Sequence, residues 1–251
     1  GSKKYPVKDP FNELAKGSLN TYLNALTYSD KTVYPIASRN EKDFQNLMDV
    51  YMDAVFHPNI GKEKKIFMQE GWHYEMENAD DELKVNGVVY SEMKGASSSP
   101  DNAVWDTVGK TMFPDTTYGV NSGGDPAVIP ELSYEQFLEF HRSHYHPSNS
   151  YIFIYGDCDM DERLRFLDKE YLSNFDKIDP HSEVEHQKHF GSNTPKIVHE
   201  KYSVGQTDAT DGKSYLVFSS LGGSNLDVLE ARAASVVAYV LFNAEGAPVK
   251  Q

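Results

Sequence analysis

The distribution of hydrophobic and polar positions predicts a mixture of extended and helical elements. Two extended segments, residues 20–27 and 32–36, flank the polar turn Ser29-Asp30-Lys31, which predicts a β-hairpin. Beyond the hairpin, Asn40 is placed to cap a helix that ends near His57-Pro58. Apolar residues recur through this helix at helical spacing and form one stripe. They are Phe44, Leu47, Met48, Tyr51, Met52 and Val55.

Further helices are predicted along the chain. Residues 62–77 form a charge-rich helical stretch, and a third helix is expected over residues 85–96. Residues 112–130 are rich in glycine and proline and predict a long ordered loop. Ser133 and Gln136 fit a capping box that opens a helix towards His144. The next helix is predicted by apolar residues at helical spacing, namely Leu164, Leu167, Tyr171, Leu172 and Phe175.

Strand-like segments follow these helices and define the predicted fold class. The β-branched and aromatic run at 151–155 predicts a strand, as do residues 196–202 and 214–220, and a helix is expected over 226–242. Together the elements predict an α+β fold, a mostly antiparallel sheet covered by helices. We expect a first domain part at residues 1–175, a polar linker at 176–196 and a following α/β segment at 197–251.

Composition narrows the function classes. The chain has 251 residues, 39% of them hydrophobic and 25% charged, which is typical of a folded globular protein. No apolar run approaches the roughly 18 residues of a membrane span, so we expect no membrane partner. The net charge of −14 argues against nucleic-acid binding, and it favours a generally acidic surface over a cation-binding cavity. The one cysteine, Cys158, is expected to be structural and suits a reducing compartment.

Glu92 occupies an unusual position in the helix predicted over residues 85–96. Val85, Val88, Val89 and Ala96 lie on the same helical face. A carboxylate within such a stripe costs free energy unless it is paired, hydrogen-bonded or bound to a metal. The pattern by itself favours an ion pair or a partly exposed face over a zinc ligand, because zinc needs at least two more protein ligands.

Two groups of histidines are the other candidates for metal binding. His141, His144 and His146 gather near the end of one predicted helix, but without the acidic spacing of known zinc motifs, so packing or surface roles are favoured. The second group lies in the polar linker and is expected to be solvated. Its members are His181, His186 and His189. No serine-nucleophile elbow or phosphate loop is present, so the residues alone predict no complete catalytic constellation.

Several longer motifs occur in a specific order from the first residues to Gly246-Ala247-Pro248. They are Lys4-Tyr5-Pro6-Val7-Lys8-Asp9-Pro10-Phe11, Gln69-Glu70-Gly71-Trp72, Gly87-Val88-Val89-Tyr90-Ser91-Glu92-Met93-Lys94-Gly95, Ser122-Gly123-Gly124-Asp125-Pro126 and His144-Tyr145-His146-Pro147-Ser148-Asn149. In this order the motifs closely resemble the presequence-protease branch of the pitrilysin/insulinase family of zinc peptidases.

The resemblance implies a metal site that this chain shares with other parts of its parent. In the family, an H-x-x-E-H helix supplies two zinc-binding histidines and a general-base glutamate, and a distant glutamate supplies the third ligand. The resemblance places this third ligand on Glu92. H-x-x-E-H does not occur in the chain, which is expected to be an N-terminally truncated fragment that starts just after the motif. We therefore expect Zn²⁺ in the full-length protein and no catalysis by this chain alone.

The resemblance also implies a substrate and a cellular setting. Asn24, Ala25, Leu26 and Thr27 match an edge strand that pairs with extended peptides through main-chain hydrogen bonds. The expected function is that of a zinc metalloendopeptidase that degrades short or unstructured peptides, in a bacterial cytoplasm or an organelle matrix. The expected partners are peptides and the remaining domains of the parent chain. Apolar surface left uncovered in the fragment could also drive dimerisation.

Two other functions remain open at this level. The chain could belong to a non-catalytic homologue that serves as a peptide-binding or assembly subunit. It could also be an acidic cation-binding module that uses the His/Glu linker. This third hypothesis predicts zinc affinity that survives Glu92→Ala but not the replacement of His186 and His189.

Overall fold

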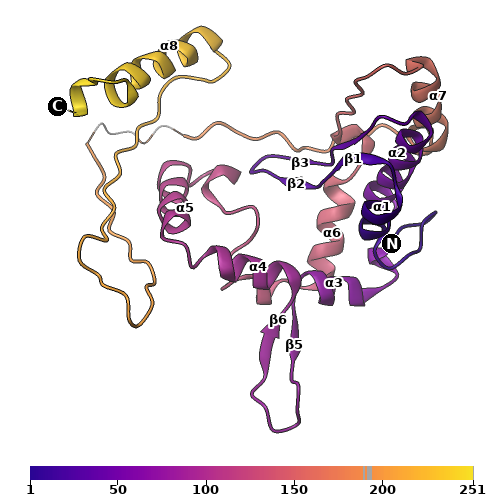
Figure 1. The fold of residues 1–251 in the computed structure, drawn as a ribbon, viewed down its shortest axis with the longest axis horizontal. Helices are drawn as coiled ribbons and strands as arrows, with labels where there is room; N and C mark the ends of the chain where they lie inside the picture. The colour runs from indigo at the N-terminus through magenta and orange to yellow at the C-terminus, as the bar shows by residue number, and fades with distance from the viewer. Residues whose placement is uncertain (189, 191–193, 251) are drawn as a thin grey trace. The chain divides into compact units, whose positions relative to one another are not determined.

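The computed structural model describes residues 1–188, 190 and 194–250, and these divide into two compact units, residues 1–208 and 209–251. The fold is mixed α+β and mostly helical (Figure 1). Seven α-helices are described in the first unit: α1 Pro10–Gly17, α2 Glu41–Phe56, α3 Lys64–Glu70, α4 Val88–Ala96, α5 Pro100–Met112, α6 Tyr134–His144 and α7 Met160–Glu170. The second unit contains α8 Val228–Ala238, a π-helical turn at Tyr239–Asn243 and a 3₁₀ turn at Pro248–Lys250. The linker at residues 176–196 and the domain bounds on either side of it stay a prediction.

The strands of the described residues form three two-stranded antiparallel sheets. They pair β1 Asn20–Leu23 with β4 Ile36–Ser38, β2 Leu26–Thr27 with β3 Thr32–Val33, and β5 His73–Glu75 with β6 Lys84–Asn86. The first four strands belong to one long hairpin, in which Leu26 lies opposite Val33 and Thr27 opposite Thr32. The hairpin predicted from the sequence is therefore confirmed.

The larger antiparallel sheet is a wrong prediction. Residues 151–155, 196–202 and 214–220 form no strand with any part of the chain that the structure describes. A β-type composition gives a segment only a preference, whereas a strand also needs a neighbour to which its backbone can bond. Phe153 and Tyr155 instead leave 87% and 88% of their surface exposed. The α+β class stands, but the residues that the structure describes form no extensive sheet covered by helices.

The two helices with predicted caps begin as expected. The Asn40 side chain accepts from the Asp43 N–H at 2.9 Å, and α2 ends at Phe56, directly before His57-Pro58. At the start of α6, the Ser133 hydroxyl accepts from the Gln136 N–H at 3.1 Å, and the Gln136 side chain accepts from the Ser133 N–H at 2.8 Å. Both capping interactions satisfy backbone donors that have no partner within the helix.

Two predicted helices are shorter than expected, and two were missed. The helix predicted over residues 62–77 ends at Glu70 because Gly71 breaks it, and β5 follows. The helix predicted from Val85 begins at Val88, and Val85 lies in β6. Gly87 separates the two elements with φ +154°, and a Cβ there would lie 2.2 Å from the Gly71 carbonyl oxygen. Helices α1 and α5, which Pro10 and Pro100 open, were not predicted.

The core of the first unit centres on α2 and the end of α7. Leu47 on α2 and Tyr171 at the end of α7 are completely buried, and Leu167 is 2% exposed. His57, at the end of α2, stacks on Phe175 with ring centroids 5.6 Å apart. Helix α3 contacts both α4 and α6, which connects the core to the rest of the unit.

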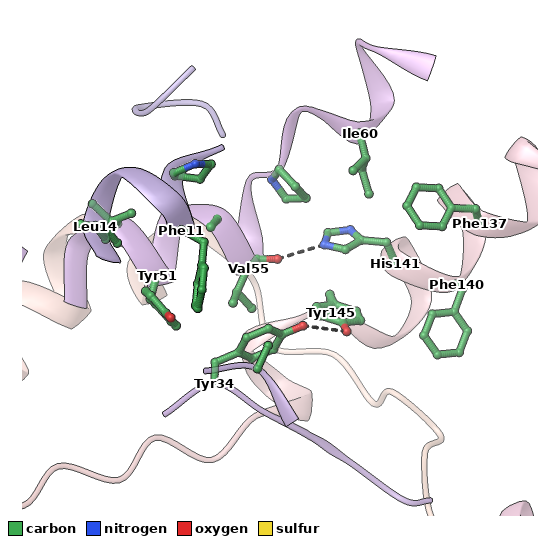
Figure 2. A pocket seen from close by; sticks show the side chains of 15 residues that line it. Phe11, Leu14, Tyr34, Tyr51, Val55, Ile60, Phe137, Phe140, His141 and Tyr145 are labelled. Carbon is green, nitrogen blue, oxygen red and sulfur yellow. Dashed lines mark hydrogen bonds between the residues drawn. The ribbon is translucent and has the colours of Figure 1, made fainter. Parts of the chain in front are cut away.

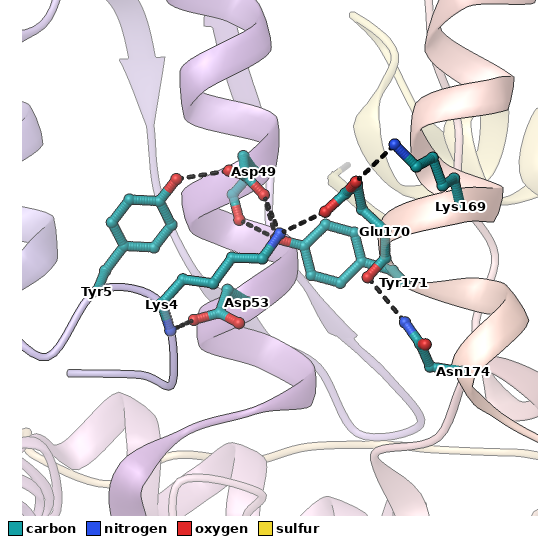
Figure 3. A network of polar contacts seen from close by, with 8 residues as sticks. All are labelled: Lys4, Tyr5, Asp49, Asp53, Lys169, Glu170, Tyr171 and Asn174. Carbon is teal, nitrogen blue, oxygen red and sulfur yellow. Dashed lines mark hydrogen bonds and ion pairs between the residues drawn. The ribbon is translucent and has the colours of Figure 1, made fainter.

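A polar network joins the N-terminal segment to this core (Figure 3). Lys4 Nζ lies 3.0 Å from Asp49 Oδ1 and 3.3 Å from Glu170 Oε2. The hydroxyls of Tyr5 and Tyr171 both donate to the Asp49 carboxylate. Burial favours the protonated form of Asp49, but hydrogen bonds from Tyr171, Tyr5 and Lys4 outweigh burial and lower its pKa. The network therefore holds an ionised carboxylate between three segments of the chain.

None of the described helices is both long enough and apolar enough to cross a membrane.

Candidate functional site

The hairpin of residues 20–38 has a free edge along the predicted peptide-binding segment. The N–H of Asn24 donates to the Pro35 carbonyl at 3.2 Å, and that of Tyr28 donates to the Lys31 carbonyl at 2.8 Å. In an antiparallel pair, alternate residues direct their backbone groups towards the partner strand. Asn24, Leu26 and Tyr28 therefore face the partner strand, and the residues between them face the other way.

Ala25 and Thr27 are the residues that direct backbone groups outward. The β2–β3 sheet has two strands among the described residues, so no third strand covers this edge. The Ala25 N–H donates to the Asn24 side chain at 2.8 Å, an interaction that an incoming carbonyl could replace. Both Ala25 and Thr27 are exposed. All four predicted substrate-binding residues thus lie on one arm of the hairpin, with Leu26 and Thr27 in β2 and with Ala25 and Thr27 exposed.

Ala25 borders an apolar hollow of about 460 Å³, which is lined by α1, α2, α6 and the hairpin (Figure 2). The Tyr34 and Tyr145 hydroxyls lie 2.9 Å apart at its wall. His141 Nε2 lies 2.9 Å from the Val55 carbonyl oxygen, and because a carbonyl only accepts, Nε2 carries the proton. Burial lowers the pKa of His141, which packs here as a neutral ring.

Thr27 borders a second hollow of about 400 Å³, here called the Trp105 hollow. Its walls are residues 27–29 of the hairpin, residues 105, 106 and 109 of α5, and residues 118–123 of the following loop. The Thr117 hydroxyl donates to the Ser29 carbonyl at 2.6 Å, and the Tyr118 hydroxyl donates to the Asp30 carboxylate at 2.9 Å. These two bonds hold the loop against the turn of the hairpin.

The same loop also connects the hollow to helix α4. A Cβ added to Gly123 would lie 2.5 Å from the Met93 sulfur, so the loop packs directly on the residue that follows Glu92. Helix α4 presents an open face, on which Val88 is 52% exposed and Val89 37% exposed. Glu92 is also exposed and makes no hydrogen bond or ion pair with any described residue. Of the alternatives that the pattern favoured, the structure thus agrees with the exposed helix face, and the ion pair does not form with a described residue.

The histidines considered as metal ligands have other surroundings. His144 stacks on Phe140 with ring centroids 4.5 Å apart, and His146 Nδ1 accepts from the Ser148 N–H at 3.0 Å. His181 lies 3.4 Å from the Asp179 carboxylate on the surface. His189 lies outside the described residues. Cys158 is a free, half-buried thiol.

Comparison with known proteins finds relatives along the whole chain. Residues 131–247 match the family described as the peptidase M16 inactive domain. The chain is 53% identical over 251 residues to protein HypA of Clostridium perfringens, with 100% of this chain and 26% of that protein covered. It is 45% identical over 254 residues to presequence protease 1 of Arabidopsis thaliana, with 100% and 23% covered. It is 38% identical over 253 residues to the mitochondrial presequence protease of Drosophila melanogaster, with 99% and 24% covered.

The chain belongs to the M16 (pitrilysin) peptidase family.

This M16 chain spans about a quarter of the length of the relatives named above. The match to the inactive domain begins at residue 131, so residues 24–27 and Glu92 lie outside it. The family uses zinc. Within the described part of the chain, no three His, Cys, Asp or Glu side chains gather closely enough to hold a metal ion. Because zinc needs at least three protein ligands, these residues do not complete a zinc site.

The sequence prediction did not single out the Trp105 hollow. The hollow depends on a loop and a hairpin far apart in sequence, which no local pattern brings together. The signal available in the sequence was Pro100, which is typical of the first turn of a helix, with Trp105 five residues later. The structure adds that Trp105 is 68% exposed.

Proposed function

We propose that this chain is part of a zinc metalloendopeptidase that degrades short or unstructured peptides. In this proposal, residues 24–27 bind an extended peptide and Glu92 supplies one zinc ligand in the longer parent protein. The observation that carries the proposal is the free, accessible edge of the hairpin, which borders the Trp105 hollow, whose loop in turn packs on helix α4. Membership in the M16 family supplies the chemical context.

The free edge supports recognition of peptides by their main chain. An extended peptide that pairs with Ala25 and Thr27 would add a third strand to the β2–β3 sheet. Such pairing depends on backbone groups, which all peptides share, so it tolerates varied side chains. The two flanking hollows then supply whatever side-chain preference exists.

The exposure of Glu92 supports a ligand role shared with residues outside this chain. Glu92 has no partner among the described residues, so no ion pair has to be broken before it can bind a metal. Val88 and Val89 on α4 are exposed as well, as expected of a helix face that contacts another segment.

A comparison of this chain with the longer parent protein tests the proposal. We expect no hydrolysis of unstructured peptides by the 251-residue chain, and zinc-dependent hydrolysis by the parent. Glu92→Gln in the parent should abolish both activity and zinc retention, measured by metal analysis. Glu162→Gln is the control, because Glu162 is exposed on α7 and should leave both unchanged. Full activity and zinc content in the Glu92→Gln parent would refute the ligand role.

A second function, peptide binding without hydrolysis, is favoured by one observation. Residues 131–247 match the domain described as inactive. In a non-catalytic homologue, the free edge would still bind peptides, but the parent would neither retain zinc nor hydrolyse them. The same assay distinguishes the two functions, because only the peptidase converts bound peptide into fragments.

The exposed aromatic residues at 151–155 fit contact with the remaining domains of a longer protein. Tyr151, Phe153 and Tyr155 are nearly fully exposed in the chain as described. We propose that those domains cover them, and that the isolated chain can self-associate through the same surface. Sedimentation of the chain should then show a dimer that Phe153→Ser disperses, and a monomer at all concentrations would refute self-association.

A further inference from the structure

We propose that the Trp105 hollow binds a cationic side chain, of the arginine or lysine type, from the peptide that pairs with the hairpin edge. This inference rests on the proposed function, since it assumes that a peptide lies along residues 24–27. It adds a specificity site to a recognition mode that would otherwise depend on the main chain alone.

The position of the hollow places it within reach of such a peptide. Thr27 forms part of both the outward edge and the wall of the hollow. Side chains of an extended peptide alternate between the two faces of the sheet, and every second one projects to the same side. A peptide strand that passes Thr27 can therefore project a side chain towards α5.

The aromatic wall of the hollow suits a cation. Trp105 is 68% exposed, so its indole ring is available to a ligand. Tryptophan is the side chain that attracts ammonium and guanidinium groups most strongly through its ring face. Tyr28 and Tyr118 also line the hollow. Lys31 lies 5.1 Å from the centroid of the Tyr28 ring, so a cation already occupies one aromatic face at this rim.

The charge of the hollow supplies the second half of the recognition. Asp106 is the one charged residue among the described residues that line it. Asn121 Nδ2 donates to Asp106 Oδ1 at 3.3 Å, which orients the carboxylate and leaves Oδ2 open. Lys110 lies one helical turn further along α5, yet it forms no ion pair with Asp106 in the described structure. A guanidinium could therefore stack on Trp105 and bond to Asp106 together.

The size of the hollow and the overall charge of the chain agree with this ligand. A volume of about 400 Å³ is ample for one long side chain. Gly109, Gly119 and Gly123 form parts of the wall and add no side chain that would fill it. The net charge of −14 also raises the local concentration of cationic peptides near the surface.

Binding of matched peptides to the 251-residue chain tests the proposal. The probes are short unstructured Ala/Ser/Thr peptides that carry one arginine, moved through the sequence, and the same peptides with citrulline, the neutral isostere. We expect at least one arginine position to bind about tenfold more tightly than its citrulline counterpart by calorimetry. This comparison changes only the peptide, so it does not depend on the folding of any variant.

Two variants and one control locate the effect on the protein. Asp106→Asn and Trp105→Leu should each remove most of the preference for arginine over citrulline, and Asp106→Asn should leave the affinity for citrulline peptides unchanged. Asp101→Asn alters an exposed acid of the same helix outside the hollow and should retain the preference. A Trp72→Phe background leaves Trp105 as the only tryptophan, so its fluorescence should respond to arginine peptides.

The outcomes separate this inference from the proposed function. Equal affinity for arginine and citrulline peptides, or a preference that survives both variants, would overturn the cation site and leave edge binding intact. Absence of binding by every peptide would overturn both. A preference that is lost in both variants, with edge binding retained, supports the two together.

Discussion

Two regions of the first unit differ in how fully their side chains are buried or hydrogen-bonded within the chain. Around α2 and α7, Leu47 and Tyr171 are fully buried and Asp49 accepts hydrogen bonds from three side chains. Around α4, α5 and the hairpin edge, Glu92 has no described partner and Trp105 is 68% exposed. The first of these, here called the closed region, can stabilise the chain by itself. The second, here called the open region, holds groups whose partners must come from a ligand or from other chain segments.

The largest effect is expected where the closed region loses packing. Tyr171→Ala removes a fully buried ring together with its bond to Asp49, and should lower the free energy of unfolding by about 3–5 kcal/mol. Trp105→Ala is the matched control in the open region and should change the free energy of unfolding by about 0.5 kcal/mol or less. Urea denaturation measures both. Equal losses would contradict the contrast between the two regions.

A smaller effect is expected from the polar network. Asp49→Asn weakens the bonds from Lys4, Tyr5 and Tyr171, and should cost about 1.5–3 kcal/mol at neutral pH. Because folding lowers the pKa of Asp49, its contribution is present above the unfolded pKa of about 3.9 and is lost as the pH falls through the lower folded value. The difference between Asp49→Asn and the wild type should therefore vanish in acid. Glu139→Gln, in an exposed pair with Arg142, should show no such pH dependence.

A third prediction concerns the apolar hollow that lies between the two regions. Burial lowers the pKa of His141, so the unfolded chain binds a proton at higher pH than the folded chain. Stability should decrease as the pH falls below about 6.5. His141→Phe should cost about 0.5–1.5 kcal/mol near pH 8, where the bond to Val55 is lost, and its stability should depend less on pH. His57, whose pKa burial also lowers, should account for the remaining dependence. A pH profile unchanged by His141→Phe would contradict this assignment.

The smallest effect is expected at Glu92. Glu92→Gln removes an exposed charge that has no described partner, so the unfolding free energy of the chain should change by about 0.5 kcal/mol or less. Under the proposed function the same substitution abolishes activity in the longer parent, so the proposal predicts that stability and function separate at this residue. A loss of more than about 1 kcal/mol in the chain alone would show that Glu92 belongs to the closed region after all.

Local signals predicted those parts of the fold that local interactions determine. The caps at Asn40 and Ser133 satisfy helix donors with neighbouring residues, and both helices begin where expected. The hairpin around Ser29-Asp30-Lys31 depends on a short turn and was also predicted correctly. Residues 151–155 show the limit, because strand formation needs a partner that composition does not specify.

The candidate site was only partly predictable for related reasons. The stripe that included Val85 assumed a continuous helix, but Gly87 divides strand from helix, and Glu92 lies on an exposed face, one of the alternatives that the pattern left open. Its proposed role comes from resemblance to the family and remains a prediction. The Trp105 hollow depends on contacts across the fold, including the bond from Thr117 to Ser29, which periodicity does not reveal.

The direction of helix α4 depends on Gly87. Gly87 lies against the Gly71 carbonyl, and the Tyr90 N–H donates to the same carbonyl at 3.4 Å, so the first turn of α4 rests on a backbone contact between two residues without side chains. The direction in which α4 presents its carboxylate is therefore set at this joint rather than by Glu92 itself. A mutational survey of the parent should find Gly71 and Gly87 as intolerant of substitution as a metal ligand, although neither has an atom that could bind one.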